Sequence, residues 1–291
     1  MTHPFLSDEW MAAAHEIRPA IVDVHLAEAR ARWGLGNKPI DVCIYAHGGL
    51  VGEKDAAANA AEWIPLLYDH QIFPIYLMWE TDFMSTVHNR LNDAIRDVQR
   101  PAGGGEGFWM RAERWWNERL ERLLAKPGTE IWGEMKQNAA AISGNKQSGA
   151  VLLYNAFSGS AAAKQPVRFH LVGHSAGSIV HAHIIDALAD KLKFESVSFL
   201  APAVRHDSFD KLVRPRLTDG TIKRYQQFHL TDKAEEDDPT CTPYQRSLLY
   251  LVSESFEGGE RTPITIVPDF VPLKKTTACS ASSAMRSKRS A

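Results

Sequence analysis

A serine between two glycines is the strongest chemical signal in the chain. Gly173-His174-Ser175-Ala176-Gly177 has the Gly-x-Ser-x-Gly spacing of a nucleophilic serine, and residues 167–172 are rich in the apolar, β-branched and aromatic side chains that favour a strand. Apolar residues then recur at helical spacing over 179–188. A sharp strand-to-helix turn strains the serine backbone and exposes its hydroxyl, while the glycines avoid collisions with neighbouring elements. We therefore predict that Ser175 is a nucleophile; the alternative is an ordinary strand–helix junction.

A second motif, His-Gly-Gly, follows a strand predicted over 40–46. Acyl transfer to a serine needs two amide N–H donors that face the developing oxyanion. One is the amide after the nucleophile, here Ala176, and the other comes from a glycine-containing loop after an earlier strand. We expect this second donor at Gly49, with Gly48 and Leu50 as alternatives. Taken alone, the motif is also typical of a simple glycine turn.

Together the two motifs resemble the α/β-hydrolase family, and the resemblance extends over roughly residues 38 to 270. It implies an α/β fold with a mostly parallel, doubly wound sheet and helices on both faces. It also implies a triad in the chain order serine, acid, histidine, and it implies no cofactor.

The resemblance places the triad acid after a strand that we expect over 222–230, and Asp232 lies at that position. A carboxylate there orients the imidazole and stabilises the imidazolium. Asp207 and Asp210, after the preceding strand, are the alternatives. The acidic run at 235–238 is more typical of a solvated loop.

The histidine required by this order is missing. The last of the 12 histidines is His229, and none follows it. His206 follows a strand at the correct edge and His229 lies within a strand, and we assign the base to neither. We expect His47 to brace the glycine loop and His174 to pack within the turn.

The C-terminal residues 274–291 contain five basic residues, no acidic residue and mostly Ser, Ala and Thr, which predicts a disordered basic tail. The family's histidine loop would follow a last strand that we expect at 264–267. We therefore expect that the end of the chain departs from the ancestral sequence, by truncation or by a shifted frame. Weak attachment to an acidic surface is the alternative use of the tail.

The stretch from about 88 to 165 is too long for one crossover helix and is rich in tryptophan. We expect two or three helices that form a cap over the active site. Trp109 and Trp116 are candidates for an apolar substrate wall; the alternative is that they pack the cap onto the sheet. The other expected elements are a helix over 56–67, strands at 21–26, 72–78 and 197–200, and a helix start at 242–245.

Length and composition fit one α/β domain over residues 38–270, between an N-terminal segment at 1–37 and a tail at 271–291. The 291 residues are 44% hydrophobic and carry a net charge of −2, which gives no charge-based argument for nucleic acid binding. Three dispersed cysteines predict neither a disulfide framework nor a zinc site, so we expect no metal. No secretory leader and no run of about 18 apolar residues is seen, so we expect a cytoplasmic protein without a membrane span.

These features predict a serine hydrolase that cleaves the carboxylic ester of an apolar, medium-sized small molecule through an acyl-enzyme on Ser175. The missing histidine leaves an alternative: a slow or inactive protein of hydrolase fold that binds a ligand or a partner. The leaving group is not fixed, because lipases, thioesterases, amidases and lactonases use the same parts.

Overall fold

A computed structural model describes residues 20–49, 53–79, 89, 106–159, 165–238, 241, 244–258 and 262. The side chains of residues 53 and 106–113 are outside this description. Leu50, the strand expected at 264–267 and the tail at 271–291 lie outside the described residues, as does the side chain of Trp109.

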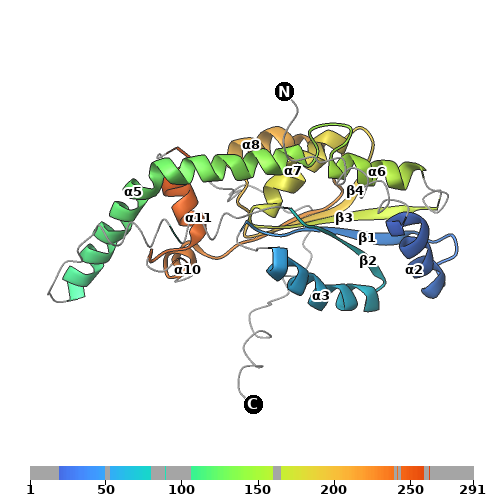
Figure 1. Ribbon diagram of the computed structural model, residues 1–291, viewed down its shortest axis with the longest axis horizontal. Coiled ribbons are helices and arrows are strands. Elements are labelled where there is room, and N and C mark those ends of the chain that lie inside the picture. The colour runs from blue at the N-terminus through green and yellow to red at the C-terminus, as the bar shows by residue number, and fades with distance from the viewer. Residues whose placement is uncertain are drawn as a thin grey trace, which may run out of the picture.

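A five-stranded parallel sheet forms the centre of the molecule (Figure 1). The strand order is β2-β1-β3-β4-β5, and all four neighbouring pairs are parallel. The strands are β1 Ile40–Ala46, β2 Ile72–Leu77, β3 Val167–His174, β4 Phe194–Leu200 and β5 Tyr225–Phe228. The prediction of an α/β fold is thus confirmed at the level of class.

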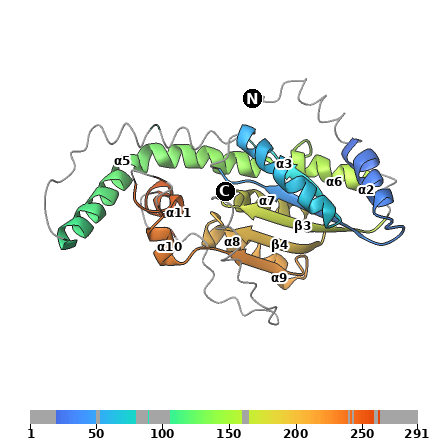
Figure 2. The ribbon, with the colours of Figure 1, turned by 90° about the horizontal axis from the view of Figure 1, so that it is seen from below.

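Helices lie on both faces of this sheet (Figure 1). α3 (Glu53–Asp69) lies on one face, and Figure 2 shows it crossing in front of the strands. α6 (Gly149–Gly159), α7 (Gly177–Leu188) and α8 (His206–Leu212) lie on the other face. α5 (Glu106–Ala141) contacts α7. None of the described helices is long and apolar enough to cross a bilayer.

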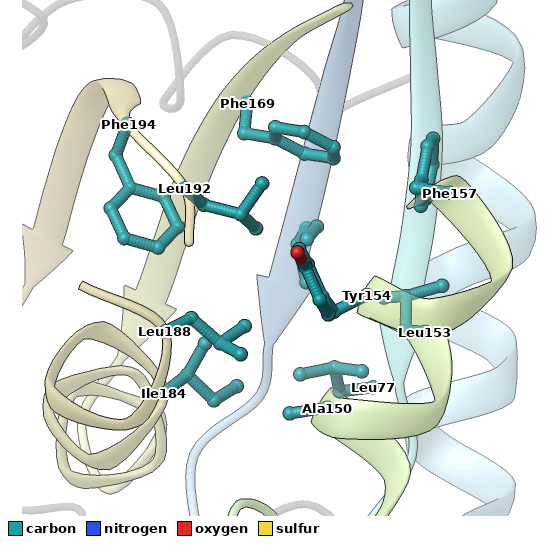
Figure 3. Close-up of a pocket in the computed structure, with 11 residues that line it drawn as sticks. Leu77, Ala150, Leu153, Tyr154, Phe157, Phe169, Ile184, Leu188, Leu192 and Phe194 are labelled. Carbon is teal, nitrogen blue, oxygen red and sulfur yellow. The ribbon is translucent and has the colours of Figure 1, made fainter. Parts of the chain in front are cut away.

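α6 and α7 share an apolar layer with the sheet, and Figure 3 shows a cavity in this layer. The cavity has a volume of about 20 Å³ and no polar lining, so it is a small packing gap rather than a ligand site. Phe169 and Phe194, near the amino ends of β3 and β4, lie at one side of it. Its lining residues are Ile44, Leu77, Ala150, Leu153, Tyr154, Phe157, Phe169, Ile184, Leu188, Leu192 and Phe194.

The described part of the insertion between β2 and β3 includes the helices α5 and α6. α5 has 36 residues and contains Pro127 and Gly128 in its interior. Proline removes one backbone hydrogen bond there. A Cβ at Gly128 would collide with the ring of Phe256, which belongs to η3 (Val252–Phe256), so the glycine allows close packing of η3 against α5.

The small C-terminal elements follow β4 and β5. They are α9 (Arg214–Thr218), α10 (Asp232–Glu236) and α11 (Leu248–Leu251), which continues directly into η3. The strand expected at 222–230 is shorter, at 225–228, although Ile222 forms an isolated parallel bridge with Phe194.

Two local predictions were wrong. Residues 21–26 are helical rather than extended, within η1 (Ala20–Leu26) and before α2 (Ala27–Arg32), because Val22, Leu26 and Ala29 bury one helical face. No helix begins at 244–245: the Gln245 N–H donates to Asn117 Oδ1 of α5, which holds this segment against α5.

Candidate active site

Ser175 stands at the turn between β3 and α7 in a strained backbone conformation. Its φ angle is +50°, a region that residues other than glycine rarely adopt. Its N–H donates to the carbonyl of Leu200 at 2.8 Å, which ties the turn to the end of β4. Ala201, next to that carbonyl, also has a positive φ of +43°. Strained residues of this kind gather at functional sites, where the surrounding structure holds them in place.

The two glycines of the pentapeptide are required by close packing. A Cβ at Gly173 would lie 2.9 Å from the carbonyl carbon and oxygen of Gly177. A Cβ at Gly177 would overlap the carbonyl oxygen of Ala46, in the neighbouring strand. The turn therefore brings α7 against β1 as well as β3, and larger side chains would push these elements apart.

The glycine loop lies directly beside the serine. Ala46 pairs with Gly173 in the parallel ladder, so β1 and β3 end at the same level. A Cβ at Gly48 would lie 3.1 Å from Ser175 Cβ and 3.0 Å from His174 Nδ1. Gly48 and Gly49 are both buried. The structure thus brings together the two motifs, which are separated by more than 100 residues in the sequence.

Three backbone amides at this place are available as donors. Among the described residues, the N–H groups of Ala176, Gly48 and Gly49, the last of them the donor expected from the sequence, form no hydrogen bond with the protein. Ala176 lies immediately before the first residue of α7, where the helix dipole favours negative charge. The arrangement resembles an oxyanion hole, in which two preorganised amides face the same point.

His47 holds the glycine loop in place through its side chain. Its Nδ1 contacts the Gly48 carbonyl oxygen at 2.9 Å, so this nitrogen carries the proton and donates. Trp79 fixes the same residue: its indole N–H donates to the His47 carbonyl oxygen at 3.0 Å, and its backbone N–H donates to His47 Nε2 at 3.4 Å. Burial lowers the pKa of His47, so the ring is neutral at pH 7.

None of the described histidine side chains forms a hydrogen bond with the Ser175 hydroxyl. Within the described ranges, the Ser175 hydroxyl forms no hydrogen bond to any side chain. His174 is half-buried. Its pKa is lowered, mainly by burial and to a smaller extent by electrostatic repulsion from the nearby His47. His181 is fully buried under the turn, where its Nε2 contacts the Val172 carbonyl at 3.0 Å and burial lowers its pKa to about 4. His229 is exposed, and its Nδ1 contacts the Leu230 carbonyl.

The candidate acids all have partners other than a catalytic histidine. Asp232 is exposed, begins α10 and accepts a hydrogen bond from the Tyr250 hydroxyl at 2.5 Å. Asp207 forms a bidentate ion pair with Arg205, whose hydrogen bonds lower the Asp207 pKa to about 2. Asp210 contacts Arg214 at 2.6 Å.

Two histidine–carboxylate pairs lie in or next to the sheet. His206 Nδ1 is 3.3 Å from Asp210 Oδ2 within α8. His170 Nε2 is 2.9 Å from Asp41 Oδ1, but His170 precedes Ser175 by five residues along β3. At about 3.3 Å per residue, the four steps from His170 to the end of β3 at His174 alone span about 13 Å, so His170 lies too far from the serine for proton transfer.

The His170–Asp41 pair belongs to a polar cavity on the open part of the sheet, beside α3. The cavity has a volume of about 350 Å³. Its charged groups pair with one another, since Arg168 is bidentate to Asp41 at 2.6 Å and Arg224 Nη2 lies 3.8 Å from Glu195 Oε1. Its lining residues are Asp41, Cys43, Leu67, Ile72, Arg168, His170, Val172, Glu195, Ser196 and Arg224.

A charged cluster joins α5 to the segment after β4. The side chain of Glu257 is 2% exposed and accepts hydrogen bonds from Trp132 Nε1 at 2.5 Å, Lys136 Nζ at 2.8 Å and Arg205 Nη1 at 3.0 Å. Burial alone would raise the pKa of Glu257, but these three donors outweigh burial and lower it. Trp116, a candidate for the substrate wall, is 4% exposed and lies in the hydrophobic core.

Within the described ranges, no group of three or more His, Cys, Asp or Glu side chains is placed to hold a metal ion. Cys43 and Cys241 are buried, and neither forms a disulfide. Comparison of the chain with protein-family models, with curated proteins and with solved structures finds no match.

Proposed function

We propose that this protein is a serine hydrolase of the α/β-hydrolase type that cleaves a carboxylic ester through an acyl-enzyme on Ser175. The observation that carries the proposal is the contact between the two motifs: Gly48 lies against the strained Ser175, with unbonded amides on either side. Adjacent parallel strands bring these two loops together in any case; the strained serine and the unbonded amides beside it are what support a nucleophile rather than a simple junction.

The parts suit the chemistry of acyl transfer. Ser175 Oγ attacks the ester carbonyl carbon, the carbon–oxygen bond to the alcohol breaks, and the alcohol leaves with the proton that the serine gives up. Water then cleaves the acyl-enzyme and releases the acid. The N–H of Ala176 and an amide of the Gly48–Gly49 turn stabilise the oxyanion in both steps, and losing one such donor typically costs about 100- to 1,000-fold in rate.

The second candidate function is ligand binding by a slow or inactive hydrolase fold. It is favoured by the absence, among the described residues, of an imidazole or a carboxylate in contact with the Ser175 hydroxyl. An oxyanion hole and substrate binding alone retain about 1,000- to 10,000-fold acceleration over water. The two candidates therefore differ in rate rather than in architecture.

Hydrolysis of a short p-nitrophenyl ester tests the proposal. We expect weak turnover by the wild-type chain and its loss to the background rate in Ser175→Ala. Ser255→Ala is the matched control, because Ser255 is a fully buried serine that donates to the Glu121 carbonyl of α5. Retention of most activity in Ser175→Ala would contradict the assignment, and no turnover in the wild-type chain would favour ligand binding.

A further inference from the structure

Ser178, in the first turn of α7, is buried beneath the nucleophile. It is 0% exposed, and its hydroxyl donates to the Ser175 carbonyl oxygen at 2.6 Å. The same hydroxyl oxygen accepts the N–H groups of Ala203 and Val204, each at 3.1 Å. One side chain thus ties the turn of the serine to the segment that follows β4.

The Ser175 carbonyl is held by three donors. Besides the Ser178 hydroxyl, it accepts the Ser178 N–H at 3.0 Å and the Ala203 N–H at 3.1 Å. Because a peptide unit is planar and trans, the direction of this carbonyl fixes the direction of the Ala176 N–H, which points the opposite way. The donors to the Ser175 carbonyl therefore also set the direction of the Ala176 N–H, on the opposite side of the same peptide unit.

The strain at Ser175 makes this support necessary. A non-glycine residue at a positive φ persists only where its surroundings over-determine it. The preceding peptide is fixed by the bond from Ser175 N–H to Leu200, and the following peptide by Ser178 and Ala203. Among these groups, Ser178 supplies the one side-chain contact, so it is the contact that a substitution can remove.

We propose that Ser178 is a positioning residue that orients the Ala176 amide toward the oxyanion, without touching the substrate itself. This inference rests on the proposed function of Ser175. It predicts that loss of the Ser178 hydroxyl slows the chemical step while leaving substrate binding and the fold in place.

The test is the second-order rate constant for labelling by a fluorophosphonate probe, whose P=O oxygen occupies the oxyanion position. In Ser178→Ala we expect this constant to fall at least tenfold, and kcat on a p-nitrophenyl ester to fall in parallel with little change in KM. Ser255→Ala, which removes an equally buried hydroxyl bonded to α5, should stay within about twofold of wild type. Ser178→Thr keeps the hydroxyl and should restore most of the rate. Labelling of folded Ser178→Ala at the wild-type rate would overturn the inference, as would a tenfold loss in folded Ser178→Thr.

Amide hydrogen exchange separates this inference from the proposed function. If the wild-type chain is not labelled at all, the proposed function fails, but the exchange measurement still decides the role of Ser178. We expect the Ala203 amide to exchange at least tenfold faster in Ser178→Ala than in the wild-type chain and in Ser255→Ala. Unchanged exchange at Ala203 would show that Ser178 does not hold the turn.

Discussion

The positive φ of Ser175 predicts that the nucleophile position destabilises the fold. Glycine is the residue that adopts this conformation without a steric penalty, whereas serine and alanine both carry a Cβ. We therefore expect Ser175→Gly to be more stable than Ser175→Ala, although both variants lack the nucleophile. The comparison isolates the backbone, because the Ser175 hydroxyl forms no hydrogen bond to any side chain in the described part of the chain.

The expected size follows from two opposing terms. Left-handed backbone costs a residue with a Cβ about 1–2 kcal/mol. Glycine loses more conformational entropy on folding, which offsets about 0.5–1 kcal/mol of that gain. The net advantage of Ser175→Gly over Ser175→Ala is then about 1 kcal/mol, or roughly 2 °C in Tm for a protein of this size.

Thermal and urea unfolding of the two variants measure this difference. The control is the same pair of substitutions at Ser255, which lies in η3, where glycine in a helical segment is worse than alanine by about 1 kcal/mol. The order of stability should therefore reverse between the two sites. If Ser175→Gly is less stable than Ser175→Ala, the turn is not strained as described.

Three further predictions concern the loop, the charged cluster and the base. Gly48→Val should reduce fluorophosphonate labelling at least 100-fold in a folded protein, because a side chain there meets Ser175 and His174; unchanged labelling of the folded variant would move the donor elsewhere. Glu257→Gln should lower the unfolding free energy by about 2 kcal/mol at pH 7, less than the full cost of breaking a buried pair because its cationic partners reach solvent. The folded pKa of Glu257 lies below its ordinary 4.5, so the stability that its charge contributes is present above pH 4.5 and is lost as the pH falls through the folded pKa. The unfolding free energies of the wild-type and Glu257→Gln proteins should therefore converge in acid, and a difference between them that stays constant down to pH 3 would refute this. His206→Ala and His229→Ala should each reduce ester hydrolysis far less than Ser175→Ala, and a loss equal to that of the serine variant would identify a base.

The central part of the fold could be predicted from the sequence because its patterns are local. Apolar patterns predict strands over 40–46 and 72–78 and a helix over 56–67, and the structure has β1 at Ile40–Ala46, β2 at Ile72–Leu77 and α3 at Glu53–Asp69. The contact between Gly48 and Ser175 could be expected only because both residues follow parallel strands, whose carboxyl ends meet at one edge of the sheet.

The failed predictions are those in which tertiary contacts decide. The short apolar run at 21–26 fits the spacing of a strand as well as that of a helix. Burial of Val22 and Leu26 on one face favours the helix. The residues at 242–245 fit the pattern of a helix start, but the Gln245 N–H donates to Asn117 Oδ1 of α5 instead. Ser178 was missed because a serine in the first turn of a helix has no distinctive sequence pattern, and Ala203 and Val204, whose N–H groups it accepts, are distant in the sequence.

The most direct test of the account is to treat the wild-type chain with a fluorophosphonate probe and to map the modified peptide by mass spectrometry. The account predicts one adduct, on Ser175, that is absent from Ser175→Ala and from a heat-denatured sample. An adduct on another serine, or equal modification of native and denatured protein, would contradict the claim that this turn is built for a nucleophile.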